Sequence, residues 1–357
     1  MKTEHQILFA NARRMKALSD RSVDLVVTSP PYPMIEMWDT LFCAQNPAVK
    51  KKLSAGDGPG AFELMHTLLD PVWKEVFRVL KYGGFACVNI GDATRTIRGR
   101  FALYANHARM LQSFQKLGFS VLPCILWRKQ TNAPNKFMGS GMLPAGAYVT
   151  LEHEYILILR KGDKREFLTE AVKKNRRASA LFWEERNQWF SDIWMDIKGS
   201  VQTLNDKDTR KRSAAFPFHL AYRLINMYSV KGDCVLDPFL GTGTTTLAAM
   251  AAGRNSVGYE IDTGLETAID RSRAGIVELS KQVIAHRLER HMAFVRQRTA
   301  DGKPIKHQNI PYGFPVITAQ EKELFIDLPV SIQSVEKNQY AVSYASDHLL
   351  ELTAPTG

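Results

Sequence analysis

Residues 235–262 read VLDPFLGTGTTTLAAMAAGRNSVGYEID, and this stretch decides the fold. An apolar run ends at Asp237, a loop with two glycines follows, and a helical stretch of small residues leads to a second apolar run that ends on Glu260. A strand, a glycine turn, a helix and a strand in this order form the unit of a parallel sheet with helices on its faces. Ligands of such sheets bind at the carboxyl ends of the strands, so we expect the glycine loop to line a site.

The glycine loop has the residues of a nucleotide-type site. Gly241 and Gly243 let the backbone approach a ligand, and the helix that begins at Thr244 and Thr245 offers free N–H groups to an anion. Glu260 follows at roughly 20 residues, the separation at which an acid binds ribose hydroxyls in dinucleotide folds.

Two common cofactor classes do not fit this loop. A P-loop needs Lys after its last glycine and a dinucleotide fingerprint needs a third glycine, but positions 244 and 246 are both Thr. S-adenosyl-L-methionine is the remaining candidate cofactor, and a tight turn that binds no ligand is the alternative.

Strand and helix patterns alternate through most of the chain. Further β-rich runs lie at 23–29, 85–90, 121–128 and 154–160, and helical patterns lie at 62–80, 106–117 and 217–228. Several of the β-rich runs are apolar throughout, which is typical of buried parallel strands. We therefore expect a doubly wound, mostly parallel α/β sheet. Two stretches stand apart: residues 43–60, rich in Gly, Lys and Ala, are expected to form a mobile loop, and residues 286–298 (HRLERHMAFVRQR) a basic helix.

Composition limits the class of protein and of partner. The 357 residues carry a formal net charge of +11, which favours a polyanionic partner. The four cysteines have no C-x-x-C spacing, so we expect neither disulfides nor a metal site, and a reducing cytoplasm. No uncharged apolar run is long enough to span a membrane, and the N-terminus does not resemble a secretory signal.

A second informative stretch, VVTSPPYPMIEMWD, occupies residues 26–39. A β-branched strand here runs into Ser29, Pro30, Pro31 and Tyr32, a rigid shelf in which the prolines fix φ. The exocyclic amine of a base is a poor nucleophile because its lone pair is delocalised into the ring. The Ser29 hydroxyl and the Pro30 carbonyl could accept its two hydrogens and free the lone pair to attack a sulfonium methyl, while Tyr32 stacks on a flipped base.

The two motifs together resemble a known family. T-S-P-P-Y followed much later by D-P-F-x-G-x-G-T-T is similar to the DNA amino-methyltransferases of bacterial restriction–modification systems, in the circularly permuted order of their β group. The likeness covers roughly residues 6–275 and includes RVLKYGGFACVNIGD, LEHEYILILRKG and AAFPFHLAYRLINMYSVKGD. It implies a Rossmann-like fold, S-adenosyl-L-methionine as cofactor and double-stranded DNA as substrate, with a cognate restriction endonuclease as the other half of the pair.

The resemblance also assigns site residues. Catalysis would rest on Ser29, Pro30, Pro31 and Tyr32. The cofactor would be held by Asp237, Phe239, Gly241, Gly243, Thr244 and Thr245, with Glu260 on the ribose and with Phe216 and Pro217 at the methionine end. Family members commonly have Gly-Asp near the N-terminus, where this chain has Ala10-Asn11, so Asn11 takes the place of an acid that faces the adenine amine.

The target base is left open by the chemistry, since a hydroxyl at position 29 is an adequate acceptor for either amine. Family members with Ser at this position are mostly cytosine-N4 enzymes, and those with Asp are mostly adenine-N6 enzymes. The resemblance therefore favours cytosine N4, with adenine N6 as the alternative. Methylation of RNA or of a protein amide, and a non-catalytic DNA-binding module, are further alternatives.

The same resemblance divides the chain into four regions. Residues 1–160 would form the catalytic half, 161–212 a small inserted target-recognition region with interleaved basic and aromatic residues, and 213–285 the cofactor-binding half. Residues 286–357 would be a basic C-terminal extension of unknown role.

Two other polar features are interpreted as structural, and a third is left open. Cys124 lies in an apolar strand pattern, which predicts a buried core thiol rather than a nucleophile. His153 and Glu154 have no second histidine at helical spacing, so a strand-edge polar pair is expected rather than a metal site. Asp92 either lines the crevice or forms a plain turn.

Overall fold

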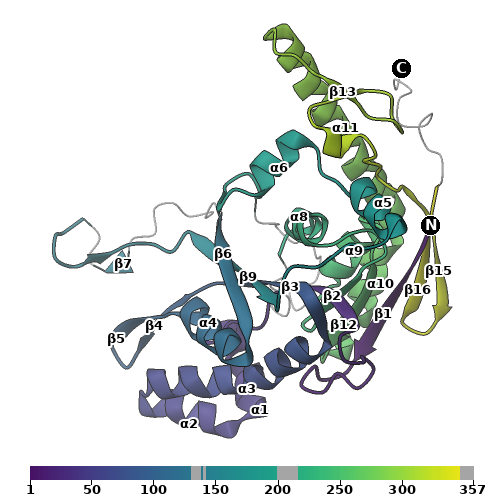
Figure 1. The fold of residues 1–357 in the computed structure, drawn as a ribbon. Helices are drawn as coiled ribbons and strands as arrows, with labels where there is room; N and C mark the ends of the chain where they lie inside the picture. Colours follow the sequence, from purple (N-terminus) through teal and green to yellow (C-terminus); the bar gives the residue numbers. More distant parts are fainter. Residues whose placement is uncertain (130–137, 140–141, 199–215, 346–357) are drawn as a thin grey trace.

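The structure is a computed structural model that describes residues 1–129, 138–139, 142–198 and 216–345. Its framework is one ten-stranded sheet in the order β10-β6-β9-β3-β2-β11-β12-β1-β16-β15 (Figure 1). The strands are β1 (Lys2–Phe9), β2 (Val23–Thr28), β3 (Leu80–Ile90), β6 (Phe119–Arg128), β9 (His153–Lys161), β10 (Ile193–Trp194), β11 (Cys234–Asp237), β12 (Asn255–Glu260), β15 (Pro329–Glu336) and β16 (Gln339–Tyr344).

The centre of this sheet is parallel. Strands β3, β2, β11, β12 and β1 pair in parallel, whereas β9 and β16 pair antiparallel on either side of them. The β-rich runs expected from the sequence coincide with β2, β3, β6, β9, β11 and β12, so the prediction of a doubly wound α/β sheet is confirmed.

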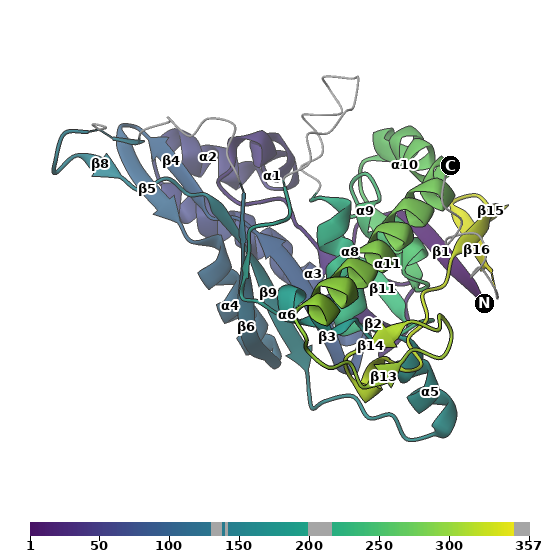
Figure 2. The same cartoon turned by 90° about the horizontal axis from the view of Figure 1, so that it is seen from above.

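Helices cover both faces of the sheet, as the two views show (Figures 1 and 2). On one face lie α3 (Gly58–Val79) and α4 (Asn106–Leu117), and on the other α8 (Phe218–Tyr228), α9 (Thr244–Ala251) and α11 (Ile276–Ala300). In β2, Val26 packs into the core beneath α3 and α4, and Leu25 and Val27 into the core beneath α8 and α9, because successive side chains of a strand point to opposite faces. The apolar run of β2 is therefore buried on both sides.

The prediction of a mobile loop at residues 43–60 is wrong. This stretch contains the end of α1 (Asp39–Gln45), all of α2 (Pro47–Ala55) and the start of α3. The Asn46 side chain accepts a hydrogen bond from Ala48 N at 3.0 Å and caps α2, and the Asp57 side chain accepts one from Gly60 N at 2.8 Å and caps α3. Capping residues and a proline at the first helical positions stabilise these starts despite the glycines.

The C-terminal region is built into the fold. The predicted basic helix at 286–298 is confirmed as part of α11, and β16 pairs antiparallel with β1, so the hairpin of β15 and β16 extends the sheet. Tyr344 donates a hydrogen bond to Met250 O at 2.6 Å and shares another with Thr3 Oγ1 at 2.9 Å. No helix among the described residues is long and apolar enough to cross a membrane.

Candidate active site

The two motif loops emerge side by side. Strands β2 and β11 are parallel neighbours, with Leu25 beside Val235 and Val26 beside Leu236, so both strands end at the same edge of the sheet. The Thr28 hydroxyl at the end of β2 donates a hydrogen bond of 2.6 Å to Asp237 Oδ1 at the end of β11. Two residues that are 209 positions apart in the chain are thus joined directly at the crevice.

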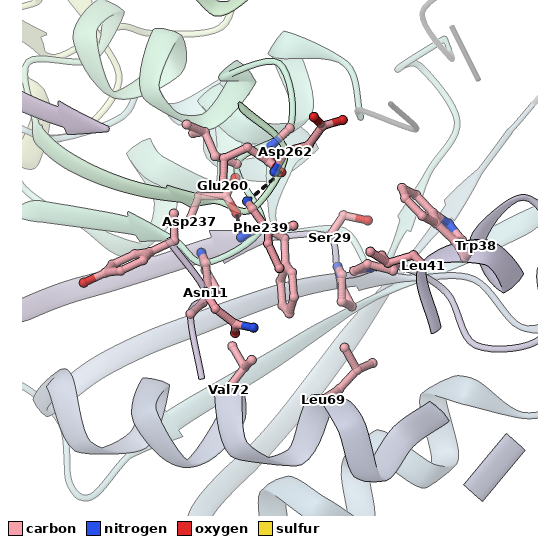
Figure 3. Close-up of a pocket in the computed structure, with 18 of the residues that line it drawn as sticks. Asn11, Ser29, Trp38, Leu41, Leu69, Val72, Asp237, Phe239, Glu260 and Asp262 are labelled. Carbon is pink, nitrogen blue, oxygen red and sulfur yellow. Dashed lines mark hydrogen bonds between the residues drawn. The ribbon is translucent and has the colours of Figure 1, made fainter. Parts of the chain in front are cut away.

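A cavity of about 470 Å³ opens at this edge (Figure 3). Ten of the residues assigned from the sequence line it: Asn11, Ser29, Pro30, Pro31, Phe216, Asp237, Phe239, Gly241, Thr244 and Glu260. Four assigned residues, Tyr32, Pro217, Gly243 and Thr245, are not part of its wall. The structure therefore brings together most of the predicted site.

Asp237 joins the loops. Its carboxylate is buried and accepts hydrogen bonds from Thr28 Oγ1, from Thr245 Oγ1 at 2.7 Å and from Phe239 N at 3.0 Å. Burial raises the pKa of Asp237 to about 6, although these hydrogen bonds oppose the shift. Three of the roughly four acceptor sites of the Asp237 carboxylate are thus used within the protein, and its assignment as a cofactor ligand remains a prediction.

Glu260 fixes the glycine loop to β12. Its Oε2 accepts a hydrogen bond from Gly241 N at 2.7 Å, and its Oε1 accepts from Ile261 N and Asp262 N, both at 2.8 Å. Burial raises the pKa of this carboxyl, and the backbone donors counteract that shift. Two carboxylate oxygens offer about four acceptor sites, so Glu260 retains capacity for a ligand hydroxyl at the cavity wall.

The two loop glycines differ in what surrounds them. Gly241 has φ +57°, and a Cβ there would meet only Phe239 O at 4.0 Å, at the cavity wall. Gly243 has φ +86°, and a Cβ there would meet Ile269 at 3.6 Å, away from the cavity. Gly243 is therefore required by the left-handed turn before α9, not by space for a ligand as the sequence suggested.

The remaining cofactor residues also have defined places. Asn11 is exposed at the cavity wall, and its Oδ1 accepts a hydrogen bond from Arg13 N at 3.0 Å. Phe216 is buried and lines the cavity, whereas Pro217 is the residue that precedes α8 and starts that helix.

The Ser-Pro-Pro-Tyr shelf is held from behind. Met34, two residues after Tyr32, has φ +68°, which is uncommon for a non-glycine residue. Its side chain is buried, and this packing stabilises the conformation. The buried Asn106 side chain donates to Pro33 O at 3.0 Å and to Gly91 O at 2.9 Å, which ties the shelf to the end of β3. These contacts fix the backbone directly after the tetrapeptide.

Tyr32 is partly buried and does not line the cavity, so the expected stacking of its ring on a flipped base has no support from the cavity wall and stays a prediction. Its hydroxyl accepts hydrogen bonds from Ser29 Oγ at 3.0 Å and from Asn89 Nδ2 at 2.8 Å, and donates one to Glu154 Oε2 at 2.9 Å. The expectation of a strand-edge pair at 153–154 is wrong, because β9 lies inside the sheet between β6 and β3 and Glu154 reaches the shelf. The described residues contain no metal-ligand cluster.

Sequence reasoning missed one wall of the cavity. Trp38, Leu41, Leu69 and Val72, from the region of α1 and from α3, face the shelf and Phe239 (Figure 3). Trp38 is the only one of these four with a sequence signal, since it is an aromatic residue within the VVTSPPYPMIEMWD stretch. Asp262, two residues after Glu260, also lines the cavity and was not assigned.

The other two structural interpretations have clear outcomes. Asp92 accepts hydrogen bonds from His107 N at 3.1 Å and from His107 Nδ1 at 2.8 Å, so it ties the end of β3 to the start of α4 and does not line the cavity. Cys124 is partly buried and packs against the core of α3 and α4.

Much of the region predicted for target recognition is packed into the fold. Of residues 161–212, the structure describes 161–198, with α5 (Glu170–Ala178), α6 (Trp183–Trp189) and β10. Phe182, Trp189 and Trp194 are buried, so these aromatic side chains are not available to bases. Residues 199–212 lie outside the described residues, and the recognition role of 161–212 stays a prediction.

Comparison with known proteins identifies the family. A family profile described as DNA methylase, of the N6/N4 methyltransferase type, matches residues 23–271. The chain belongs to this DNA methylase family. The resemblance seen in the sequence is thereby confirmed.

The methylase is similar to one relative along nearly its whole length and to others along about three quarters of it. Type II methyltransferase M.MthZI of Methanothermobacter thermautotrophicus is 51% identical over 345 residues, which are 96% of this chain and 96% of that protein. Type II methyltransferase M.MjaI of Methanocaldococcus jannaschii is 51% identical over 279 residues, 75% of this chain and 90% of that one. The solved structure of TTHA0409, a proposed DNA modification methylase from Thermus thermophilus complexed with S-adenosyl-L-methionine, has 33% identity, a TM-score of 0.59 and coverage of 76% and 94%.

The cavity of the methylase fits S-adenosyl-L-methionine. Its volume lies within the usual range for small-molecule sites, roughly 300–1,000 Å³. Glu260 and Asp262 place carboxylate oxygens at the cavity wall, Val72 and Phe239 form an apolar part of it, and the first turn of α9 at Thr244 has free N–H groups. These groups would suit the ribose hydroxyls, the adenine ring and the carboxylate of the cofactor, respectively.

Proposed function

We propose that this DNA methyltransferase transfers the methyl group of S-adenosyl-L-methionine to the exocyclic N4 amine of cytosine in duplex DNA. The observation that carries the proposal is that Ser29, Pro30 and Pro31 line the same cavity as Gly241 and Glu260. A site for the target amine and a site for the cofactor that share one cavity place the two reactants together. This proximity is the main source of rate acceleration in such a transfer.

The chain's own residues would act on the base, and the bound cofactor would supply an electrophilic methyl group. Ser29 Oγ and the Pro30 carbonyl accept the amine hydrogens and direct its lone pair into the cavity. The apolar wall formed by Trp38, Leu41 and Leu69 gives a flipped base a place out of the duplex. A strong base is not required, because a methylated ring amine that carries a positive charge loses its proton readily.

The hydroxyl of Ser29 suits either amine, and cytosine is proposed because family members with Ser at the first position of the tetrapeptide are mostly cytosine-N4 enzymes. The relatives M.MthZI and M.MjaI are type II methyltransferases. We therefore infer that the chain is the protective half of a restriction–modification pair, with a cognate endonuclease as its functional partner.

Product analysis tests this proposal. The protein is incubated with unmethylated plasmid and methyl-labelled S-adenosyl-L-methionine, and the DNA is digested to nucleosides. We expect label in N4-methyldeoxycytidine, and none with the Ser29→Ala variant under the same conditions. Label in N6-methyldeoxyadenosine would assign the adenine alternative, and the absence of label from the DNA would overturn the proposal.

A further inference from the structure

A hydrogen-bond chain leads from the cavity wall to a buried carboxylate. Ser29 Oγ lies 3.0 Å from Tyr32 Oη, and Tyr32 Oη lies 2.9 Å from Glu154 Oε2. Asn89 Nδ2 lies 2.8 Å from Tyr32 Oη and 2.6 Å from the same oxygen of Glu154. The other carboxylate oxygen, Oε1, is paired with the ammonium of Lys129. Of these residues, only Ser29 lines the cavity.

The direction of this chain is fixed by which groups can donate. A carboxylate only accepts hydrogen bonds and an amide NH₂ only donates them. Tyr32 must therefore give its one proton to Glu154 and accept from Asn89, so the bond to Ser29 has to be donated by Ser29. Burial, and after it the charge of Glu154, raise the pKa of Tyr32 well above its usual value, so the phenol keeps the proton that it donates.

The direction matters because a serine hydroxyl can present either a proton or its lone pairs. The target amine offers hydrogens, so only lone pairs are productive at Ser29. We propose that Glu154 is a positioning residue that, through Tyr32, turns the Ser29 proton away from the cavity and leaves the Ser29 lone pairs for the amine. This inference rests on the proposed function, since it requires an amine substrate at Ser29.

Packing holds the residues of the hydrogen-bond chain in place. Asn89 is 2% exposed and the Glu154 side chain 13%. A Cβ at Gly91 would lie 3.0 Å from the Tyr32 ring and 3.2 Å from Glu154 Cγ, so a side chain at position 91 would displace both groups. The Tyr32 ring and the Glu154 side chain therefore pack close to Gly91 at the end of β3.

Glu154→Gln is the informative variant because it should reverse the direction of donation along the hydrogen-bond chain. The amide oxygen of the new residue would face Lys129, which only donates, and its NH₂ group would face Tyr32. Asn89 could turn its Oδ1, which has no hydrogen-bond partner among the described residues, toward that NH₂ group. Tyr32 would then donate to Ser29, and the Ser29 proton would point at the amine. The matched control is Glu152→Gln, the same change at a carboxylate that is 41% exposed and paired with Arg128 at 2.9 Å.

Single-turnover methylation at saturating DNA and cofactor is the measurement, on whichever base the wild-type protein methylates. We expect Glu154→Gln to lower the rate roughly 10- to 100-fold, with the Kd values for S-adenosyl-L-methionine and for DNA within about threefold of wild type. Glu152→Gln should stay within about twofold of the wild-type rate. These limits separate a loss of chemistry from a loss of binding.

Repeating the measurement in a Tyr32→Phe variant makes the test specific for the hydrogen-bond chain. In Tyr32→Phe the ring stays but the hydroxyl that links Glu154 to Ser29 is gone, so adding Glu154→Gln should lower the rate no further. A wild-type rate in Glu154→Gln, an equal loss in both backgrounds, or a loss explained by weaker binding would overturn the inference. The proposed function fails separately, if the wild-type protein yields no N4-methylated cytosine.

Discussion

Two acidic residues in the site form hydrogen bonds within the protein. Asp237 accepts from Thr28, Thr245 and Phe239, and Glu260 accepts from three backbone N–H groups that include Gly241. Both carboxylates thus hold the loops in the shape that a cofactor would meet. At the residue scale the site is arranged before any ligand is bound, which lowers the ordering cost of binding.

The charge of Asp237 makes a pH dependence at this scale testable. Its pKa is raised by burial from 3.8 to about 6 in the folded protein, so the folded state binds this proton more tightly than the unfolded state. The resulting contribution to stability is fully present below about pH 4 and is lost as the pH rises to about 6. Relative to Asp237→Asn, the free energy of unfolding of the wild type should therefore fall between about pH 4 and 6 and change little above that range. Urea denaturation of both proteins across this range measures it, and a constant difference would contradict the prediction.

The two loop glycines give a second prediction. Gly241→Ala and Gly243→Ala should each destabilise the fold by about 1–2 kcal/mol, because both residues have positive φ. Of the two variants, only Gly241→Ala should also weaken the binding of S-adenosyl-L-methionine, because Gly241 lines the cavity and Gly243 faces Ile269. Calorimetric titration gives the affinities and urea denaturation the stabilities. Equal affinities in the two variants would argue against the assignment of the cavity wall.

At the scale of elements, α6 and α11 are joined by a buried ion pair. Arg287 donates to Glu185 at 2.7 and 2.8 Å and to Tyr222 Oη at 2.9 Å, and both charged side chains are 8% exposed. This explains why part of the predicted basic helix carries charge without offering it to DNA. The same contact holds the region around Phe182 and Trp189 against the fold.

Breaking this pair from one side should be more harmful than removing it. Arg287→Leu leaves a buried carboxylate without its partner, and we expect it to cost about 3–5 kcal/mol of stability. The double variant Arg287→Leu/Glu185→Leu should lose less than the single one, because no charge is left buried. Denaturant unfolding of wild type, both single variants and the double variant measures the coupling. A double variant that loses the sum of the two single effects would rule out the coupling.

At the scale of the whole molecule, the N-terminal and C-terminal parts of the chain share the sheet. Strand β1 lies between β12 and β16, and Tyr344, Thr3 and His5 form a buried hydrogen-bonded group beside it. Without β16, β1 would be an exposed edge strand, which is prone to pair with other chains. The C-terminal extension at 286–357, whose role the sequence left unknown, therefore has a structural role through β16.

Removal of residues 329–357 tests this role. We expect a lower urea midpoint and concentration-dependent aggregation, because the edge of β1 becomes free. The control is Tyr344→Phe, which should cost about 1–3 kcal/mol through the lost hydrogen bonds but keep the edge covered. Light scattering and urea denaturation report the two effects, and a monodisperse truncated protein of unchanged midpoint would disprove the edge argument.

The amino-acid sequence by itself determined the central sheet and the two motif loops. Apolar β-branched runs, glycines and prolines act through local sterics, so the strands that end at Thr28 and Asp237 and the turns after them could be predicted. The capped helices of residues 43–60 could not, since Gly and Lys content obscured the capping residues. Only the tertiary structure decided which carboxylates face the protein, and that Tyr32 meets Glu154 across the sheet. Those contacts join residues far apart in the chain, and their direction depends on packing that no local pattern contains.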